Sequence, residues 1–277
     1  MKAIAVLLTV HNRKVKTLQC LRNLYAQQGV TDCQLHVYLT DDGCTDGTAE
    51  AIREQYPAVH IVEGDGSLYW NRGMHRAWEA AVADAVDYDY YLWLNDDTNI
   101  TADCLQRLLT HSHEQQDRAI IVGSTSATGH PEQVTYGGWS DGRLITDLSH
   151  PASCQTMNGN IVLIPRAVYD VLGMNDATFR HCLGDTDYCL RAGEQGIPCL
   201  TGVGLFGTCD LHEHMTVWMD PSQPFMKRWR NFMGPLGNNP FEFFYFRRKH
   251  YGVLAACATF ASNWIHFFFP RLWVKKQ

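Results

Sequence analysis

The sequence has no surplus of positive charge and no paired cysteine motif. Its 23 Lys and Arg stand against 29 Asp and Glu, which gives a net charge of −6. Because nucleic-acid-binding proteins need a basic surface to neutralise phosphates, this balance argues against nucleic acid as a partner. The ten cysteines are scattered, and no two of them form C-x-x-C. Without paired spacing, the cysteines are predicted to be buried thiols in a reducing compartment.

The sequence also lacks a low-complexity tract, an internal repeat and a signal-peptide cleavage site. Lys2 and the apolar run Ala3–Val10 imitate the start of a signal peptide. However, polar and basic residues follow the run where a cleavable leader has small ones. We therefore predict that Ala3–Val10 is the buried first strand of a cytoplasmic protein.

Short apolar runs alternate with amphipathic stretches over the first 125 residues. The apolar runs predict strands at 3–10, 35–39, 59–62, 90–94 and 120–123, with helices at 15–25, 48–56, 73–86 and 102–113 between them. This alternation is typical of βαβ units. We expect a doubly wound α/β half whose parallel sheet is covered on both faces.

The pattern becomes irregular after residue 125. Gly-rich, hairpin-like sequence at 136–142 precedes a strand at 160–164, a short helix that starts at Pro165, a helix at 185–195 and a strand at 199–205. Residues 126–220 are therefore predicted to form an α+β half. Residues 221–277 are rich in aromatic and basic side chains and are predicted to form a C-terminal helical extension.

Two acidic stretches follow predicted strands. Asn95–Asp97 come after strand 90–94, and Asp41–Asp42 come after strand 35–39. Ligands of open α/β sheets bind beyond the carboxyl ends of the strands. Adjacent carboxylates repel unless a cation or a basic group offsets them, and a divalent metal shared with substrate phosphates is the usual remedy. The alternative is a turn in which a side chain caps the next helix, Asp97 or Thr98 in the first stretch and Asp46 or Thr48 in the second.

Three later stretches contain candidate catalytic or ligand-binding residues. Asp185 opens the predicted helix at 185–195, where an acid is also a common cap, and Asp187 can pair with Arg191 one turn further on. In Cys209–His214, alternation puts His212 and His214 on one face of an extended chain. Gly202–Gly207 satisfies G-x-G-x-x-G, but neither a helix start nor a following acid accompanies it, so we predict a tight loop.

Four stretches of the sequence together resemble a known family. Thr9–Arg13, Thr40–Thr48, Asn95–Asp97 and Gly184–Asp187 occur in the order and at the intervals of the family 2 glycosyltransferases. The resemblance covers about residues 3–215, although Asn95 stands where the family often has an acid. It implies the GT-A fold, a Rossmann-like sandwich, with a catalytic domain over 1–220. In that domain, 1–125 would bind the nucleotide sugar and 126–220 the acceptor.

The resemblance also implies roles for single residues at the donor site. Thr9, His11 and Asp41 would line the nucleobase and ribose pocket. Asn95 and Asp96 would contact the donor as well. Arg72, at the helix start after Gly66–Trp70, would contact the diphosphate, and a solvated helix-end arginine is the alternative.

A metal and a base complete the implied site. Asp97 and His212 would bind a divalent metal, Mn²⁺ or Mg²⁺, with His214 as the other candidate histidine. Asp185 would be the general base that deprotonates the acceptor hydroxyl.

The expected function is therefore inverting transfer of a sugar from a nucleoside diphosphate donor. The acceptor would be a hydroxyl of a growing or lipid-linked surface glycan of lipopolysaccharide, O-antigen or capsule type. Gly66–Trp70 gives a hint of a rhamnose-type donor. The alternatives are a non-catalytic nucleotide- or glycan-binding module on the same fold and a nicotinamide oxidoreductase that uses Gly202–Gly207.

The C-terminal extension contains a long uncharged stretch. Tyr251–Phe269 has no formal charge over 19 residues, and basic residues flank it on both sides. Its length approaches that of a membrane span, but internal polar residues such as Asn263 weaken insertion. We expect a helix that lies on the cytoplasmic face of the inner membrane, close to a lipid-linked acceptor. The alternative is a helix packed on the catalytic domain.

Overall fold

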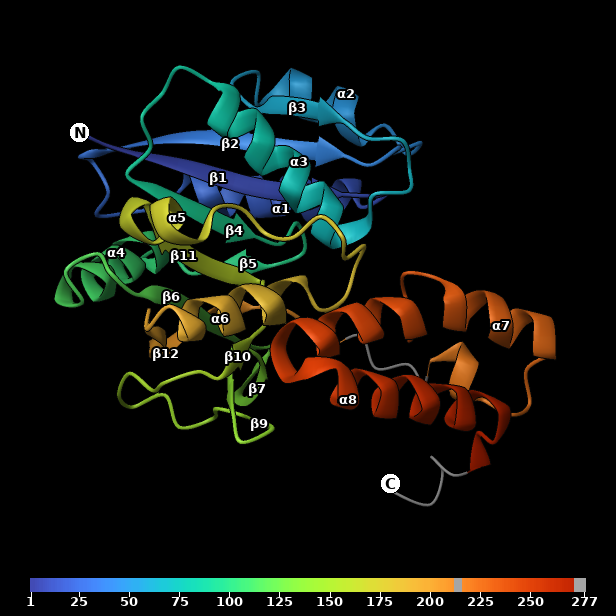
Figure 1. Ribbon diagram of the computed structural model, residues 1–277. Coiled ribbons are helices and arrows are strands. Elements are labelled where there is room, and N and C mark those ends of the chain that lie inside the picture. Colours follow the sequence, from blue (N-terminus) through green and yellow to red (C-terminus); the bar gives the residue numbers. More distant parts are fainter. Residues whose placement is uncertain (212–215, 272–277) are drawn as a thin grey trace. The chain divides into compact units, whose positions relative to one another are not determined.

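The computed structural model describes residues 1–211 and 216–271 (Figure 1). The chain divides into two compact units. The first, here called the α/β unit, consists of Met1–Ala177 and Gly184–Leu211. The second, here called the helical unit, consists of Thr178–Leu183 and His212–Gln277.

A mixed nine-stranded sheet forms the centre of the α/β unit. Its strands lie in the order β3 (His60–Glu63), β2 (Cys33–Asp41), β1 (Lys2–Val10), β4 (Tyr90–Leu94), β11 (Ile161–Pro165), β6 (Ile120–Ala127), β12 (Cys199–Thr208) and β5 (Asn99–Ile100), and β7 (His130–Tyr136) pairs with β6. The neighbours β3, β2, β1 and β4 run parallel, as predicted. β11 lies antiparallel between β4 and β6, which was not predicted. A strand buried on both faces is a continuous apolar run in either direction, so its sequence does not reveal its orientation.

Helices cover both faces of this sheet, which confirms the layered prediction. Alternate residues of β1 point to opposite faces. Ile4, Val6 and Leu8 join the core with α1 (Lys14–Tyr25), α2 (Thr48–Gln55) and α4 (Cys104–Glu114). Ala5 and Leu7 join the other core with α3 (Tyr69–Ala83), α5 (Arg166–Leu172) and α6 (Gly184–Glu194).

A small antiparallel sheet confirms the predicted hairpin. It consists of β10 (Thr156–Met157), β8 (Gly138–Ser140) and β9 (Arg143–Leu144). Asp141 and Gly142 join β8 to β9 with φ values of 50° and 71°. Two successive positive φ values are typical of a type I′ hairpin turn, and glycine adopts a positive φ without strain, which explains Gly142 at this position.

Two local predictions are wrong. Gly202–Gly207 is not a tight loop, because it lies inside β12. The register of β12 against β6 shifts on both sides of Leu205, and Gly204 has a φ of 74°, so glycines here permit a bulged strand. No helix opens at these glycines, which removes the basis for a nicotinamide site. Pro165 ends β11, and the following helix begins at Arg166.

The helical unit contains a helix that folds back on itself. Its elements are η1 (Val217–Met219), α7 (Phe225–Met233) and α8 (Pro240–Phe268). Gly252, with φ 85° and ψ 170°, divides α8 into a first arm, 240–251, and a second arm, 253–268. The arms are antiparallel (Figure 1), since the rings of Phe241 and Phe260 lie 5.5 Å apart. Trp218, Phe232 and Phe267 form the core of this unit.

Neither arm of α8 has the character of a membrane span. Within residues 1–211 and 216–271, no helix combines the length and apolarity needed to cross a bilayer.

The ten cysteines are all free. Cys182 and Cys257 are exposed, against the expectation of buried thiols.

Candidate active site

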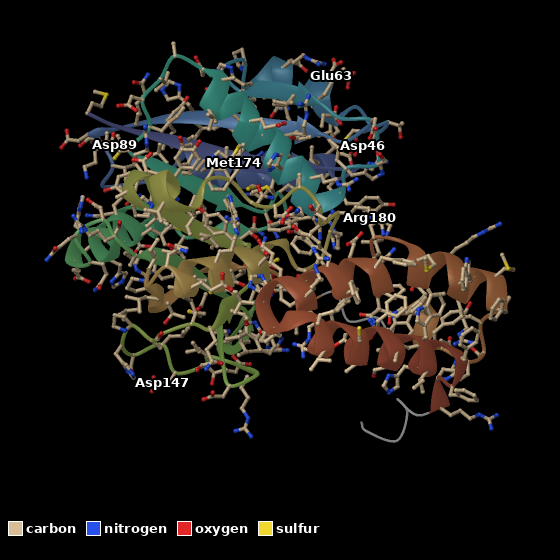
Figure 2. All side chains as sticks on the ribbon, viewed as in Figure 1. Asp46, Glu63, Asp89, Asp147, Met174 and Arg180 are labelled. Atoms are coloured by element: carbon tan, nitrogen blue, oxygen red, sulfur yellow. The ribbon has the colours of Figure 1, made fainter. Side chains whose placement is uncertain are left out.

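The predicted acidic stretches meet at one edge of the sheet, here called the carboxyl edge. β1 and β2 end side by side, with Val10 opposite Asp41, and β4 runs parallel to β1. Asn95–Asp97 follow β4 directly and therefore lie at this edge too. Figure 2 shows Asp46 at the carboxyl edge and Asp89, which precedes β4, at the opposite one.

The buried carboxylate of Asp42 organises the start of α3. Its Oδ1 accepts the N–H groups of Gly66 at 2.8 Å and Leu68 at 3.2 Å. Its Oδ2 accepts the N–H of Tyr69 at 2.9 Å. Because these amides at the helix start are paired, α3 begins at Tyr69 and not at the predicted residue 73. This role of Asp42 was not predicted, because its partners lie 24 to 27 positions away along the chain.

Asp42 should therefore be needed for stability as well as for the site. We expect Asp42→Ala to lower the free energy of unfolding by about 2–4 kcal/mol, because three N–H groups lose their acceptor. Asp65→Ala is the control, since Asp65 is exposed and accepts the N–H and the hydroxyl of Ser67 two positions further on. Urea denaturation of both variants measures the difference, and equal losses would show that the Asp42 contacts contribute little.

The residues predicted to hold the nucleoside surround this helix start. Thr9 packs so closely against Gly73 that a Cβ there would overlap its hydroxyl. The exposed ring of His11 places Nδ1 2.6 Å from the carbonyl oxygen of Asp42. Asp41 accepts the N–H of Cys44 at 2.8 Å. The structure thus gathers Thr9, His11 and Asp41 at the carboxyl edge, while their contact with a nucleotide stays a prediction.

Two alternatives from the sequence are resolved by local contacts. The N-cap of α2 is Gly47 and not Asp46 or Thr48, although Asp46 Oδ1 accepts the N–H of Thr48, the first residue of the helix, at 3.1 Å. Arg72 is not a solvated arginine, because it is half-buried and its Nε donates to the carbonyl of Ala177 at 2.9 Å. Its neighbour Asn71 donates to the carbonyl of Asp176 at 2.8 Å. These bonds fix the first turns of α3 against residues 175–177.

Asp96 and Asp97 share one guanidinium. Arg13 Nη1 lies 2.8 Å from Asp97 Oδ2 and 3.2 Å from Asp96 Oδ1, and both carboxylate side chains are at most 7% exposed. Burial raises the pKa of Asp96 to about 7, with Arg13 opposing the shift and Asp97 adding to it. A basic group, Arg13, therefore offsets the acid pair, and this partner was not predicted from the sequence. The helix-cap alternative is wrong here, because Thr98 is followed by β5.

Asp97 also faces a cavity of about 230 Å³. Lys16, Thr128 and Asp210 are among the other residues that line it. The Sγ of Cys209 lies 3.8 Å from Asp97 Oδ1. Burial and then Asp97 raise the pKa of this thiol to about 12, so it stays protonated and donates to the carboxylate.

The donor set around Asp97 fits a metal that is shared with a substrate. Within the part of the chain that the structure describes, no three His, Cys, Asp or Glu side chains could hold a metal ion by themselves. The predicted ligand His212 and its alternative His214 lie outside the described residues. Mg²⁺-type sites usually take one or two carboxylates from the protein and complete their shell with phosphates and water. Asp97, near-buried at the edge of a cavity, fits that pattern.

Asp185 lies in the first turn of α6. Its Oδ1 accepts the N–H of Thr186 at 2.7 Å, as a helix-start acid does, and its Oδ2 accepts the N–H of Gly159 at 3.1 Å. Burial raises the pKa of Asp185, and these donors oppose the shift. The predicted pair is confirmed, because Arg191 Nε lies 3.0 Å from Asp187 Oδ2.

Trp70 connects Asp185 to the carboxyl edge. Its indole N–H donates to Asn95 Oδ1 at 2.7 Å. Its ring lies against Gly159, where a Cβ would overlap it, and Gly159 in turn donates to Asp185. The structure therefore brings Asp185 into one site with Asn95. The role of Trp70 was not predicted, although the residue stands in the aromatic stretch Gly66–Trp70.

Comparison with known proteins agrees with this geometry. The family model described as glycosyl transferase family 2 matches residues 5–169. No curated protein sequence matches the chain.

Solved structures show the fold. A mannosyltransferase from Pyrobaculum calidifontis, PcManGT in complex with GDP-Man and Mn²⁺, aligns with a TM-score of 0.59 at 14% identity, over 94% of this chain and 74% of that one. S. aureus TarS 1-349 in complex with UDP aligns with a TM-score of 0.56 at 13% identity, over 76% of this chain and 61% of that one. The chain thus spans less than two thirds of the TarS fragment.

The family match covers more than half of the chain, and the structural matches share its mixed α/β architecture. The acids at the carboxyl edge lie where ligands of such sheets bind. The chain belongs to glycosyl transferase family 2 and is a nucleotide-sugar glycosyltransferase with the GT-A fold.

Proposed function

We propose that the chain is an inverting enzyme that transfers a hexose or deoxyhexose to a hydroxyl of a growing surface glycan. This glycan is of the lipopolysaccharide, O-antigen or capsule type. The observation that carries the proposal is the chain of contacts from Asn95 through Trp70 and Gly159 to Asp185. This chain of contacts supports Asp185 as the base, because it connects the Asp185 carboxylate to the stretch that contains Asp96 and Asp97.

The donor is a nucleoside diphosphate sugar held at the carboxyl edge. Thr9, His11 and Asp41 contact its nucleoside in this proposal, and Asn95 and Asp96 contact it as well. Arg72 contacts the diphosphate, with a guanidinium that the carbonyl of Ala177 orients through Nε. The complexes of similar proteins with GDP-Man and with UDP support a donor of this class.

Asp97, together with His212, holds a divalent metal, Mn²⁺ or Mg²⁺, in this proposal. Such an ion neutralises charge on the departing diphosphate. The Mn²⁺ in the similar mannosyltransferase supports this assignment. Arg13 holds Asp97 from one side and protonated Cys209 from the other. These two contacts fix the carboxylate towards its cavity.

Asp185 takes the proton from the acceptor hydroxyl as that oxygen attacks the anomeric carbon. A base works best when its pKa approaches the working pH, and burial shifts Asp185 in that direction. The N–H groups of Gly159 and Thr186 hold its carboxylate in one orientation.

A lipid-linked acceptor would place the enzyme in the cytoplasm, at the cytoplasmic face of the inner membrane. This location is part of the same proposal. The basic and aromatic C-terminal sequence supports it.

A donor screen tests the proposed function. The purified protein is incubated with a panel of UDP-, GDP- and dTDP-sugars, and release of the nucleoside diphosphate is measured with Mn²⁺ and with chelator. We expect metal-dependent release of the nucleoside diphosphate from one donor class. Release occurs even without acceptor, because water can slowly attack the donor in its place. Binding of a nucleotide without release, even with extracted glycan acceptors present, would favour the non-catalytic binding module.

A further inference from the structure

The two ends of the sequence carry charge of opposite sign. Residues 1–211 contain fourteen Lys and Arg against twenty-six Asp and Glu, which is a net charge of −12. Residues 212–277 contain nine against three, which is a net charge of +6. Such an asymmetry suggests that the basic part meets an acidic partner.

Exposed apolar side chains gather where the start of α7 meets the end of α8. The two ends are in contact, since the rings of Phe225 and Phe267 lie 5.6 Å apart. The exposed members, here called the distal patch, are Phe225, Met226, Ile265, Phe268 and Phe269, each at least 50% exposed. Ile265 and Phe268 lie one turn apart on α8, and Phe269 follows directly after the helix. Exposed large apolar side chains gathered at one end of a unit often mark an interaction site.

The distal patch stands on a rigid base. Beneath it, Trp218, Phe232 and Phe267 are buried, and the rings of Phe232 and Phe267 stack at 4.6 Å. The buried guanidinium of Arg228 donates to the carbonyls of Trp218 and Phe267. These contacts tie η1, α7 and the second arm of α8 together, so the backbone that carries the exposed rings does not have to be ordered when a partner binds.

Basic side chains accompany the patch. Lys227 and Arg230 on α7 and Arg271 after α8 are exposed. Neither α7 nor residues 253–271 contain an Asp or Glu. Aromatic side chains with a basic surround and no acid match the chemistry of an anionic bilayer surface. A second copy of the chain fits less well, because it would bring two basic surfaces together.

We propose that the distal patch docks on an anionic membrane, with its phenylalanines in the headgroup region and the basic residues on lipid phosphates. This differs from the sequence expectation of a helix lying flat along Tyr251–Phe269. The second arm buries its inner face on α7 and the first arm, as the contacts of Trp229 with Trp264 and of Phe241 with Phe260 show. The lipid docking stands on this geometry alone, and only the delivery of a lipid-linked acceptor rests on the proposed function.

The turn of α8 supplies a matched control. Val253 and Leu254 are 56% and 83% exposed at the opposite end of the second arm. About 14 residues of helix at 1.5 Å per residue, roughly 20 Å, separate them from Phe268 and Phe269. A patch that docks end-on uses the phenylalanines and leaves Val253 and Leu254 in water, whereas a helix lying flat uses both.

The test is co-sedimentation of the full-length protein with vesicles, without donor. Phosphatidylcholine vesicles are compared with vesicles that also contain phosphatidylglycerol. We expect binding only to the anionic vesicles, weakened by high salt, and a loss of about tenfold or more in the double variant Phe268→Ser/Phe269→Ser. Val253→Ser/Leu254→Ser should stay within about twofold of the unchanged protein. Thermal unfolding checks that both variants are folded.

Three results would overturn the proposal. The first is indifference of the unchanged protein to anionic vesicles. The second is an equal loss in both double variants, which would indicate a flat helix. The third is a concentration-dependent dimer in ultracentrifugation that disappears in Phe268→Ser/Phe269→Ser, which would assign the patch to a second copy. Nucleoside diphosphate release by the same variant, measured without lipid, separates a failure of docking from a failure of the proposed function.

Discussion

Asp97→Asn is expected to abolish sugar transfer at any practical Mn²⁺ concentration, a loss of at least about 10³-fold. The amide is neutral and a poorer ligand for a hard cation, whereas the fold should survive because Arg13 still pairs with Asp96. The measurement is nucleoside diphosphate release across a Mn²⁺ titration. Thermal unfolding confirms that the variant is folded.

Asp210→Asn is the matched control for Asp97→Asn. Asp210 lines the same cavity, but its carboxylate accepts the N–H of Thr128 at 2.8 Å. We expect the turnover of Asp210→Asn to stay within about tenfold of the unchanged protein, since Asp210 is not a proposed metal ligand. Full activity of Asp97→Asn, or of the unchanged protein in excess chelator, would remove the metal from Asp97.

Asp185→Asn is expected to reduce turnover by about 10²- to 10⁴-fold and leave donor affinity nearly intact. The amide keeps the shape and can still accept an N–H from Gly159 or Thr186, but it cannot take a proton. The kinetic constants kcat and KM for the donor measure the two effects separately. Asp187→Asn is the control, because it breaks the pair with Arg191 and should lower stability more than turnover.

A collapse of donor affinity in Asp185→Asn would give a different picture. Asp185 would then be a helix cap or a donor contact, and the base would lie elsewhere, with Asp187 as the next candidate. The contact between Asp185 and Gly159 would in that case serve to hold the donor side of the site.

The pH dependence follows from the burial of Asp185. Burial raises the pKa of this carboxyl above the usual aspartate value of 3.8. A base must be ionised to act, so kcat/KM should fall as the pH falls through the raised pKa. The acidic limb of the profile should therefore lie at higher pH than for an ordinary aspartate, and Asp185→Asn should lack it. A limb that persists unchanged in the variant would belong to another group.

The sequence predicted those parts of the site in which the functional residues directly follow a strand. Acids directly after apolar runs indicated the carboxyl edge, and the strands that precede them have the predicted direction. The pairing of Arg13 with Asp96 and Asp97 was not predicted, because 83 and 84 positions separate them. The same holds for the contact of Trp70 with Asn95. Such pairs form only when the sheet brings strand ends together.

The helical unit shows a second limit of sequence reasoning. The uncharged stretch from Tyr251 to Phe269 predicted one helix, and the structure confirms a helix over most of it. The stretch alone did not show that Gly252 reverses the chain or that Phe267 is buried while Phe268 is exposed. The glycine, which tolerates a positive φ, was the available signal for the turn.

The most direct test of the central claim is calorimetric titration of the purified protein with UDP, GDP and dTDP, each with Mn²⁺ and with chelator. If the carboxyl edge is a donor site in which Asp97 shares a metal with the diphosphate, one nucleotide should bind with Mn²⁺ and lose about tenfold or more in affinity with chelator. The same loss should appear in Asp97→Asn with Mn²⁺ present. Binding of no nucleotide, or equal binding with and without the metal, would contradict the account.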